Sequence, residues 1–238
     1  MDVLLVALTL TAVAVSFAVS ASAGLGGSLI LVPTLALMLG TKEGVALAAL
    51  LLAGNNVVKV IAYRRSLPVR ASALIVGCVA LGALIGARLL VAAPERLVAL
   101  AVVMAFAVSL IIETWASDPI RLAGGPTLAF ASGATSGFSG TSGPLKGVAV
   151  RSLNFDREHT VGAASLASLA GDSTKAAVFA DAQLLDSTSV MFAIAAIPLM
   201  VVATFTGRHL NRSIGEAGYA ALFWTVMSGY TVRILVRL

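Results

Sequence analysis

Long apolar segments separated by short polar turns run through most of the chain. A helix needs about 20 apolar residues to cross the hydrocarbon core of a membrane. Segments of that length are Val45–Tyr63, Ala71–Ala93, Leu97–Trp115, Thr160–Ala180, Ser187–Thr206 and Glu216–Val236, and Val3–Ser22 is also long enough. Two apolar segments, Ser28–Leu39 and Pro144–Val150, are too short to cross alone, and each follows a glycine-rich interruption. The pattern predicts an all-α integral membrane protein that crosses the membrane several times.

The two halves of the chain resemble each other in sequence. Three short motifs occur in both halves in the same order: Gly24–Gly27 with Gly137–Gly140, Leu52–Asn55 with Leu169–Asp172, and Gly86–Leu89 with Gly207–Leu210. A duplication of roughly 115 residues explains this order better than chance similarity of apolar segments does. We therefore expect a first repeat at residues 1–118 and a second at residues 119–238.

Two matched turns carry charges of opposite sign. The turn with Arg64, Arg65 and Arg70 is basic, whereas the corresponding turn, Asp181–Asp186, is acidic. Because basic turns prefer the cytoplasmic side, the two turns would lie on opposite sides of the membrane, as in an inverted repeat. Three transmembrane helices plus one broken or re-entrant helix per half would give this inversion. The expected broken helices are residues 3–39 and 122–151, and whether 3–22 crosses fully or forms half of a hairpin stays open.

The composition agrees with a membrane location. Hydrophobic residues make up 59% of the chain and charged residues only 11%, whereas soluble domains have roughly 25% charged residues. The net charge of +5 comes from basic residues gathered in the turns, which favours anionic lipid as the partner and not nucleic acid. With one cysteine and two histidines, the sequence indicates no disulfide framework, no metal site and no cofactor.

The two glycine-rich interruptions, Gly24–Ser28 and Gly133–Pro144, are candidates for an anion site. Exposed backbone is costly within a membrane unless it lines a cavity or is covered by protein. A short helix after each interruption would point its free N–H groups and positive dipole end inward, where they can bind an anion. The candidate residues are Gly24, Gly26, Gly27, Ser28, Gly137, Ser139, Gly140, Thr141, Ser142 and Gly143. The structural alternative is that these small residues only allow close helix packing.

Polar residues in the middle of two matched spans are the second candidate. Asn55 and Asn56 lie mid-span in the first half, and Asp172 does so in the second. Polar groups at that depth normally face an interior path. We interpret Asp172 either as a proton-coupling carboxylate or as the partner of a lysine.

Three lysines adjoin these polar positions in the sequence. Lys175 is three residues after Asp172, on the same helix face, and is a candidate substrate ligand. Lys59 is its counterpart in the first half, and for both lysines the alternative is that the ammonium group reaches back to the membrane surface. Lys146 either lines the site or fills a vestibule on the cytoplasmic side.

The chain has a Gly-Leu-Gly-Gly interruption at Gly24–Gly27, a second interruption with Gly143 and Pro144, and paired Ala-Gly-Asn and Ala-Gly-Asp motifs. Together these features resemble the sulfite exporter TauE/SafE family, which is also described as the 4-toluene sulfonate uptake permease family. The resemblance covers nearly the whole chain. It implies secondary transport of small sulfur-containing or organic anions across a bacterial inner membrane. It fixes neither the substrate nor the direction of transport, and a homodimer is compatible with it.

Two other functions remain alternatives at this point. Gly137–Gly140 matches the Gly-x-Ser-Gly pattern of rhomboid-like intramembrane serine proteases, in which Ser139 would need a histidine base within hydrogen-bond reach. A passive anion channel would share the polar mid-membrane residues without alternating access. The chain contains no Gly-x4-Gly-Lys-Ser/Thr motif for ATP binding, so we expect no ATP hydrolysis by this chain.

Overall fold

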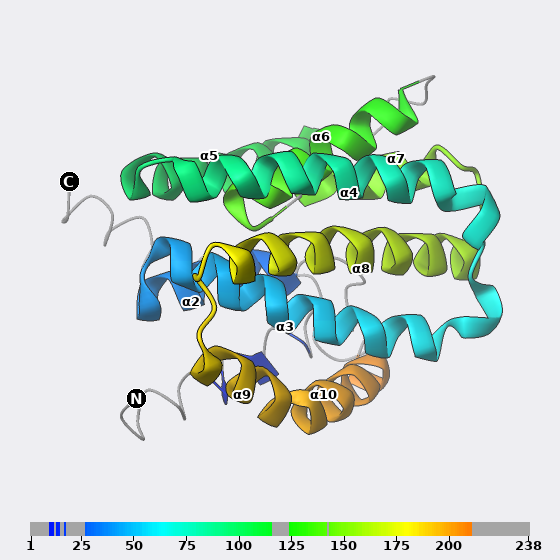
Figure 1. Cartoon of the computed structure of the whole chain (residues 1–238). Coiled ribbons are helices and arrows are strands. Elements are labelled where there is room, and N and C mark those ends of the chain that lie inside the picture. The colour runs from blue at the N-terminus through cyan, green and yellow to red at the C-terminus, as the bar shows by residue number, and fades with distance from the viewer. Residues whose placement is uncertain are drawn as a thin grey trace.

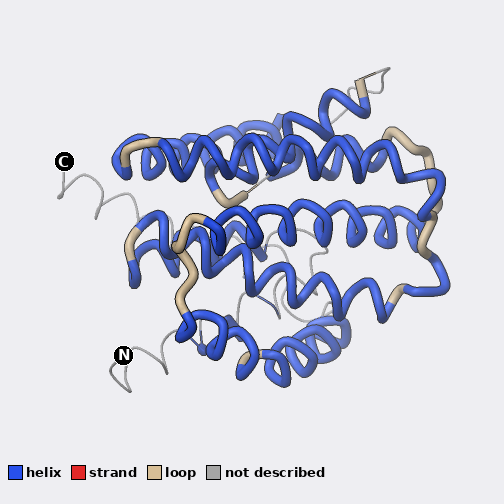
Figure 2. Tube along the Cα trace, in the orientation of Figure 1, coloured by secondary structure: helices blue, strands red, loops and turns tan. Residues whose placement is uncertain are grey.

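The computed structural model describes residues 10, 11, 13, 14 and 17, 27–115, 124–141 and 143–210. Within these residues the secondary structure is helical and no strand occurs (Figure 2). The α-helices are α2 (Gly27–Leu39), α3 (Thr41–Ala62), α4 (Val69–Ala92), α5 (Glu95–Trp115), α6 (Gly125–Ser139), α7 (Gly143–Arg151), α8 (Arg157–Asp181), α9 (Ser187–Ala195) and α10 (Ile197–Leu210), with a 3-10 turn, η1 (Arg64–Ser66), after α3. The expected all-α class is confirmed.

Most of the predicted spans correspond to helices whose ends differ from the prediction by at most four residues. The span predicted at Ser187–Thr206 is instead two helices, α9 and α10, which meet at Ala196. Pro198 explains the division, because proline has no backbone N–H to donate one turn back and its ring clashes with the preceding turn. Five positions of Val3–Ser22 are described and all are helical. Glu216–Val236 lies outside the described residues.

The second interruption is narrower than the sequence suggested. Helix α6 continues through Gly133 and Gly137 and ends at Ser139, so these glycines do not belong to the break. Gly140 ends the helix in the left-handed conformation, with φ of 80°, and its backbone N–H bonds the Ser136 carbonyl. Glycine adopts this conformation without the steric cost that other residues incur. Thr141 follows, and α7 begins at Gly143, with Pro144 in its first turn as predicted.

Glycines bring α4 and α6 into backbone contact. A Cβ atom on Gly82 would lie 2.1 Å from the Phe130 carbonyl oxygen, and one on Gly86 would lie 2.1 Å from the Ala134 carbonyl oxygen. On the facing helix, a Cβ atom on Gly133 would lie 2.2 Å from the Val79 carbonyl oxygen, and one on Gly137 would lie 2.5 Å from that of Ala83. Each helix therefore presents a Gly-x-x-x-Gly pair, the small-residue pattern that lets membrane helices pack backbone to backbone. The expectation that small residues serve packing is correct for Gly133 and Gly137.

The helices form a layered bundle in which α3 and α8 lie side by side at the centre and run in opposite directions (Figure 1). Helices α4 and α6 cover one side of this pair, and α9 and α10 lie on the other side, next to α3 (Figure 1). The main buried cluster includes Leu31, Leu35, Leu51 and Phe179, all completely or almost completely inaccessible to solvent. The polar residues in the middle of α3 and α8 are thus enclosed by apolar packing.

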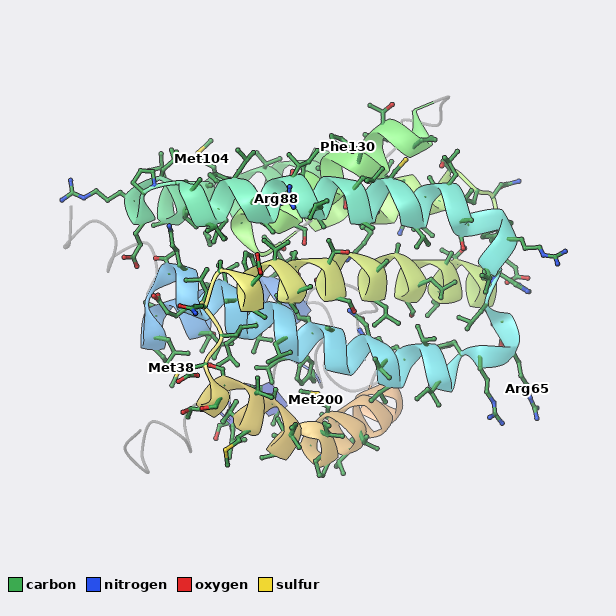
Figure 3. All side chains as sticks on the ribbon, in the orientation of Figure 1. Met38, Arg65, Arg88, Met104, Phe130 and Met200 are labelled. Atoms are coloured by element: carbon green, nitrogen blue, oxygen red, sulfur yellow. The ribbon has the colours of Figure 1, made fainter. Side chains whose placement is uncertain are left out.

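Apolar side chains cover much of the outer surface. Those exposed on α4 and α5 include Leu74, Leu81, Ile85, Leu89, Leu97, Leu100 and Met104, and Met104 and Phe130 point outward in Figure 3. Helices α3 and α4 are each long and apolar enough to cross a membrane. Large exposed apolar surfaces of this kind are unusual on soluble monomers and suit contact with lipid.

The basic turn that follows α3 lies at one end of the bundle. The turn from Tyr63 to Pro68 packs against the start of α8, where Ser66 Oγ donates a hydrogen bond to Glu158 Oε2 at 3.2 Å. Arg65 points away from the helices at this end (Figure 3). The acidic turn Asp181–Asp186 lies at the opposite end (Figure 1). The two matched turns of opposite charge are therefore separated by the length of the bundle.

Candidate functional site

The centre of the bundle contains a hydrogen bond between the two matched helices. Asn56 Nδ2 of α3 donates to Asp172 Oδ2 of α8 at 2.7 Å, and both residues are buried. Neighbouring Asn55 is also fully buried. Each of these residues lies mid-helix, so the contact lies well away from either end of the bundle. The polar mid-span residues thus face the interior, as the sequence predicted.

Asp172 also holds a lysine on its own helix. Lys175 Nζ lies 2.6 Å from Asp172 Oδ1, and the lysine side chain is 0% exposed. The same ammonium group donates to Ser136 Oγ of α6 at 2.8 Å. The alternative that Lys175 extends to the membrane surface is therefore wrong. The attraction of the partner and the further hydrogen bond offset the cost of taking the charge out of water.

Two further lysines lie within electrostatic range of this pair. Lys59 of α3, which is partly buried, interacts with Lys146 and Asp172. Lys146 of α7 is also partly buried and interacts with Asp172 and Lys175. When all four groups are ionised, three ammonium groups and one carboxylate leave a surplus of two positive charges. Opposite charges attract strongly in a low-dielectric interior, so this cluster, which we call the lysine cluster, favours an anion as its ligand.

The two interruptions meet beside this cluster. Ser28 Oγ and Thr141 Oγ1 are 3.1 Å apart and share a hydrogen bond, although they are 113 positions apart in the sequence. Ser28 is the second residue of α2 and does not precede the helix as a cap would. Ser136, one turn before Gly140, connects the two features, since its hydroxyl binds Lys175 and its carbonyl accepts from Gly140.

The remaining candidate residues of the interruptions fall into four groups. Gly27 and Gly143 are the first residues of α2 and α7. Ser139 and Thr141 are buried beside the break, and Gly137 is helical and packs against α4. Gly24, Gly26 and Ser142 lie outside the described residues. No group of three or more histidine, cysteine, aspartate or glutamate side chains able to hold a metal ion occurs in the part of the chain that the structure describes.

Comparison with known proteins gives the family. A family model, described as sulfite exporter TauE/SafE, matches residues 8–234. The chain belongs to this family. It is therefore a multi-pass membrane transporter and not an enzyme, within a family of transporters of sulfur anions. Neither the comparison with curated proteins nor that with solved structures finds a match.

The intramembrane protease hypothesis is wrong for this TauE/SafE protein. Ser139 Oγ lies 2.8 Å from the Thr135 carbonyl oxygen and 3.2 Å from that of Thr141, so its hydroxyl donates to the backbone. His159 lies at the start of α8, where its Nδ1 is 2.8 Å from Asp156 Oδ2. A serine nucleophile needs a base that accepts its proton, and among the described side chains no histidine is within hydrogen-bond distance of Ser139.

Lys59, Lys146 and Ser136 lie at or beside the lysine cluster but were not included among the candidate substrate ligands, although lining the site was one of the two interpretations of Lys146. Lys59 could have been included because it occupies the same place in the first half as Lys175 does in the second. Lys146 is two residues after Pro144, in the short helix that follows the break. Ser136 had no such signal, because a serine in an apolar helix commonly bonds its own backbone.

Proposed function

We propose that this protein is a secondary transporter of small anions, namely sulfite, sulfonates or related organosulfur or carboxylate anions, and that the lysine cluster binds them. The observation that carries the proposal is the gathering of three lysines around Asp172, of which Lys175 is fully buried and Lys59 and Lys146 are partly buried. Three lysines gathered around one carboxylate inside a membrane protein are too costly to be retained for packing alone. An incoming anion would reduce the surplus of positive charge and lower that cost.

The backbone around the interruptions supports the same location. Helices α2 and α7 begin next to each other at the hydrogen bond between Ser28 and Thr141. Their first N–H groups lack partners within the helix and carry partial positive charge. Backbone donors and ammonium groups would then bind one anion together, with Asn55 and Asn56 nearby on α3.

An inverted repeat would allow this site to open to either side. In support, α3 and α8 run in opposite directions, and so do α4 and the α9–α10 pair (Figure 1). The packing is also partly duplicated, since Gly54 faces Met200 and Gly171 faces Val79 and, farther away, Ala83. Both pairs of equivalent residues, 54 with 171 and 83 with 200, are separated by 117 positions. Rocking of two such halves about a central site is the usual basis of alternating access.

Asp172 would couple the anion to a proton. In this structure its carboxylate accepts a hydrogen bond from one of the three N–H groups of the Lys175 ammonium group. Protonation of Asp172 would remove the competing negative charge and release Lys175 to the substrate. One proton would then move with each anion.

Uptake into proteoliposomes tests the proposal. Purified protein would be reconstituted and supplied with radiolabelled sulfite, a short sulfonate or a short carboxylate, with and without a pH gradient. Saturable uptake that a pH gradient drives, and that Lys175→Met abolishes, is expected. Lys42→Met is the matched control, because Lys42 binds the Val91 carbonyl oxygen and not the lysine cluster.

The passive channel is the second candidate, and the same vesicles separate it from a transporter. A transporter exchanges external labelled anion for internal unlabelled anion faster than it allows net flow. A channel shows no such counterflow, and it responds to a proton gradient only through the membrane voltage.

We also propose that the turn with Arg64, Arg65 and Arg70 faces the cytoplasm of a bacterial cell and that Asp181–Asp186 faces outward, in keeping with the distribution of basic residues.

A further inference from the structure

Hydroxyl groups in these helices mostly bond the carbonyl one turn back. Ser72 donates to Pro68, Thr135 to Ala131, Ser139 to Thr135, Ser165 to Val161 and Thr174 to Ala170, each at 2.8 Å. This is the ordinary way in which serine and threonine are accommodated in an apolar helix. It satisfies the hydroxyl proton without any other partner.

Ser132 and Ser136 of α6 do not follow this rule. Ser132 is 0% exposed, and its hydroxyl has no hydrogen-bond partner among the described residues. Ser136 is 8% exposed and accepts a hydrogen bond from Lys175, but its own proton has no acceptor within the described part of the chain. Buried polar groups in proteins nearly always have partners. Two exceptions one helical turn apart, on one face of α6, indicate a ligand that accepts hydrogen bonds.

The positive charge beside them defines the charge of that ligand. The Lys175 ammonium group has three donors; one binds Asp172 and one binds Ser136. One ammonium proton and two hydroxyl protons therefore remain for a ligand. A ligand that satisfies all three must offer several acceptor atoms and no competing donors, which describes a small oxyanion.

We propose that Ser132, Ser136 and Lys175 form an oxygen-binding subsite that selects a three-oxygen head group, sulfonate or sulfite, over a carboxylate. This inference rests on the proposed function and assigns the part of the site that discriminates between substrates. A sulfonate has one oxygen for each of the three donors. A carboxylate also has enough lone pairs for three hydrogen bonds, but its two oxygens lie in one plane, so two donors must share one oxygen at a poorer angle, which lowers its affinity.

The test compares Ser132→Ala with the wild-type protein. Affinities for ethanesulfonate and propionate, which have the same head-group charge and similar chains, would be measured by ligand-induced thermal shift and by competition in proteoliposome uptake. We expect Ser132→Ala to weaken ethanesulfonate binding about tenfold or more, as for loss of a hydrogen bond to a charged group, and to leave propionate binding within about twofold of wild type.

The stability of the ligand-free protein provides an independent readout. Because the Ser132 hydroxyl is buried without a partner, its removal is expected to leave the melting temperature unchanged or to raise it. Affinity and stability would thus change in opposite directions, which a packing role for Ser132 does not predict. Ser72→Ala and Thr135→Val are matched controls, since each removes a hydroxyl that bonds its own helix, and neither is expected to change affinity.

Three outcomes decide the inference. Unchanged ethanesulfonate affinity in Ser132→Ala overturns the subsite, and so does an equal loss for both ligands together with a lower melting temperature. Ser132→Thr, which retains the hydroxyl, should keep more of the sulfonate preference than Ser132→Ala does. If the wild-type protein binds neither anion while it is folded, the proposed function itself fails, and the subsite fails with it.

Discussion

Asp172 and Lys175 form a buried ion pair, with 2.6 Å between Oδ1 and Nζ, on the helix that faces Asn56. The lysine bonds a hydroxyl on a third helix, α6. Three helices from the two halves of the chain therefore meet at one pair of charges. A change in the charge of Asp172 would be felt by all three.

Asp172→Asn is predicted to uncouple transport from the proton gradient. The amide keeps the size of the carboxylate and can still accept a hydrogen bond, but it cannot bind a proton in the accessible pH range. We expect the protein to insert and fold, and uptake in proteoliposomes to lose its response to a pH gradient. Uptake by this variant with wild-type pH dependence would remove the carboxylate from the coupling mechanism.

Lys175→Met is predicted to destabilise the protein by about 3–5 kcal/mol, because it leaves the buried Asp172 charge without its ammonium partner. The double variant with Asp172→Asn should recover most of that loss, since no buried charge then remains unpaired. Denaturation in detergent or lipid would give both free energies of unfolding. Additive losses in the double variant would mean that the two side chains do not interact in the folded protein.

Gly140→Leu is predicted to reduce transport severely. A Cβ atom at this position would lie 2.9 Å from Val32 Cγ1, and the φ of 80° disfavours any residue with a side chain. The side chain would also fill the break between α6 and α7, and we expect the same of Gly143→Leu. Gly77→Leu is the control, because a Cβ at Gly77 meets nothing within 4 Å. Equal transport by the Gly140 and Gly77 variants would show that the break takes no part in the passage of the anion.

Gly86→Ala is predicted to lower stability by about 1–3 kcal/mol, the usual cost of excess volume in a close-packed contact. The added methyl group would lie 2.1 Å from a carbonyl oxygen of α6, so the two helices must separate. Gly77→Ala should instead be neutral or stabilising, since alanine favours a helix more than glycine does. Melting temperatures of both purified variants give the comparison, and a tolerated alanine at Gly86 would contradict the close approach of α4 and α6.

Asp186 is predicted to make stability depend on pH at the start of α9. Ser189 donates from its hydroxyl at 2.6 Å and from its backbone nitrogen at 2.7 Å, and these hydrogen bonds lower the pKa of the Asp186 carboxyl. Because the folded pKa lies below the unfolded value of about 3.9, the stabilisation is complete above that value and is lost as the pH falls through the folded pKa.

Asp186→Ala should therefore lower the melting temperature near neutral pH, and the difference from wild type should shrink once the pH falls below the folded pKa. Asp186→Asn is the matched variant, because asparagine also caps helices but does not titrate. A difference between the alanine variant and wild type that stays constant down to the lowest usable pH would exclude the charged cap.

The apolar pattern was sufficient to predict the position of most helices. The break before Pro144 was predictable because proline and glycine have strong backbone preferences. The pattern could not show that Gly133 and Gly137 lie inside a helix, because a Gly-x-x-x-Gly pair serves equally for a break and for close packing. The pattern also could not show whether the Lys175 side chain points into the bundle or to the membrane surface, since only the fold brings Ser136 to that side chain. Sequence spacing within one helix identified Asp172 as a partner, whereas contacts between helices required the structure.

The glycine contacts between α4 and α6 limit how the molecule can move. Ridges of backbone from one helix fill the hollows left by glycine on the other, so sliding one past the other by less than a full turn would drive carbonyl groups into Cα atoms. These two helices should move together as one rigid body. Relative movement must then be taken up elsewhere. The long boundary between α3 and α8, joined at its centre by the hydrogen bond of Asn56 to Asp172, is where α3 with α9 and α10 can shift against α8 with α4 and α6.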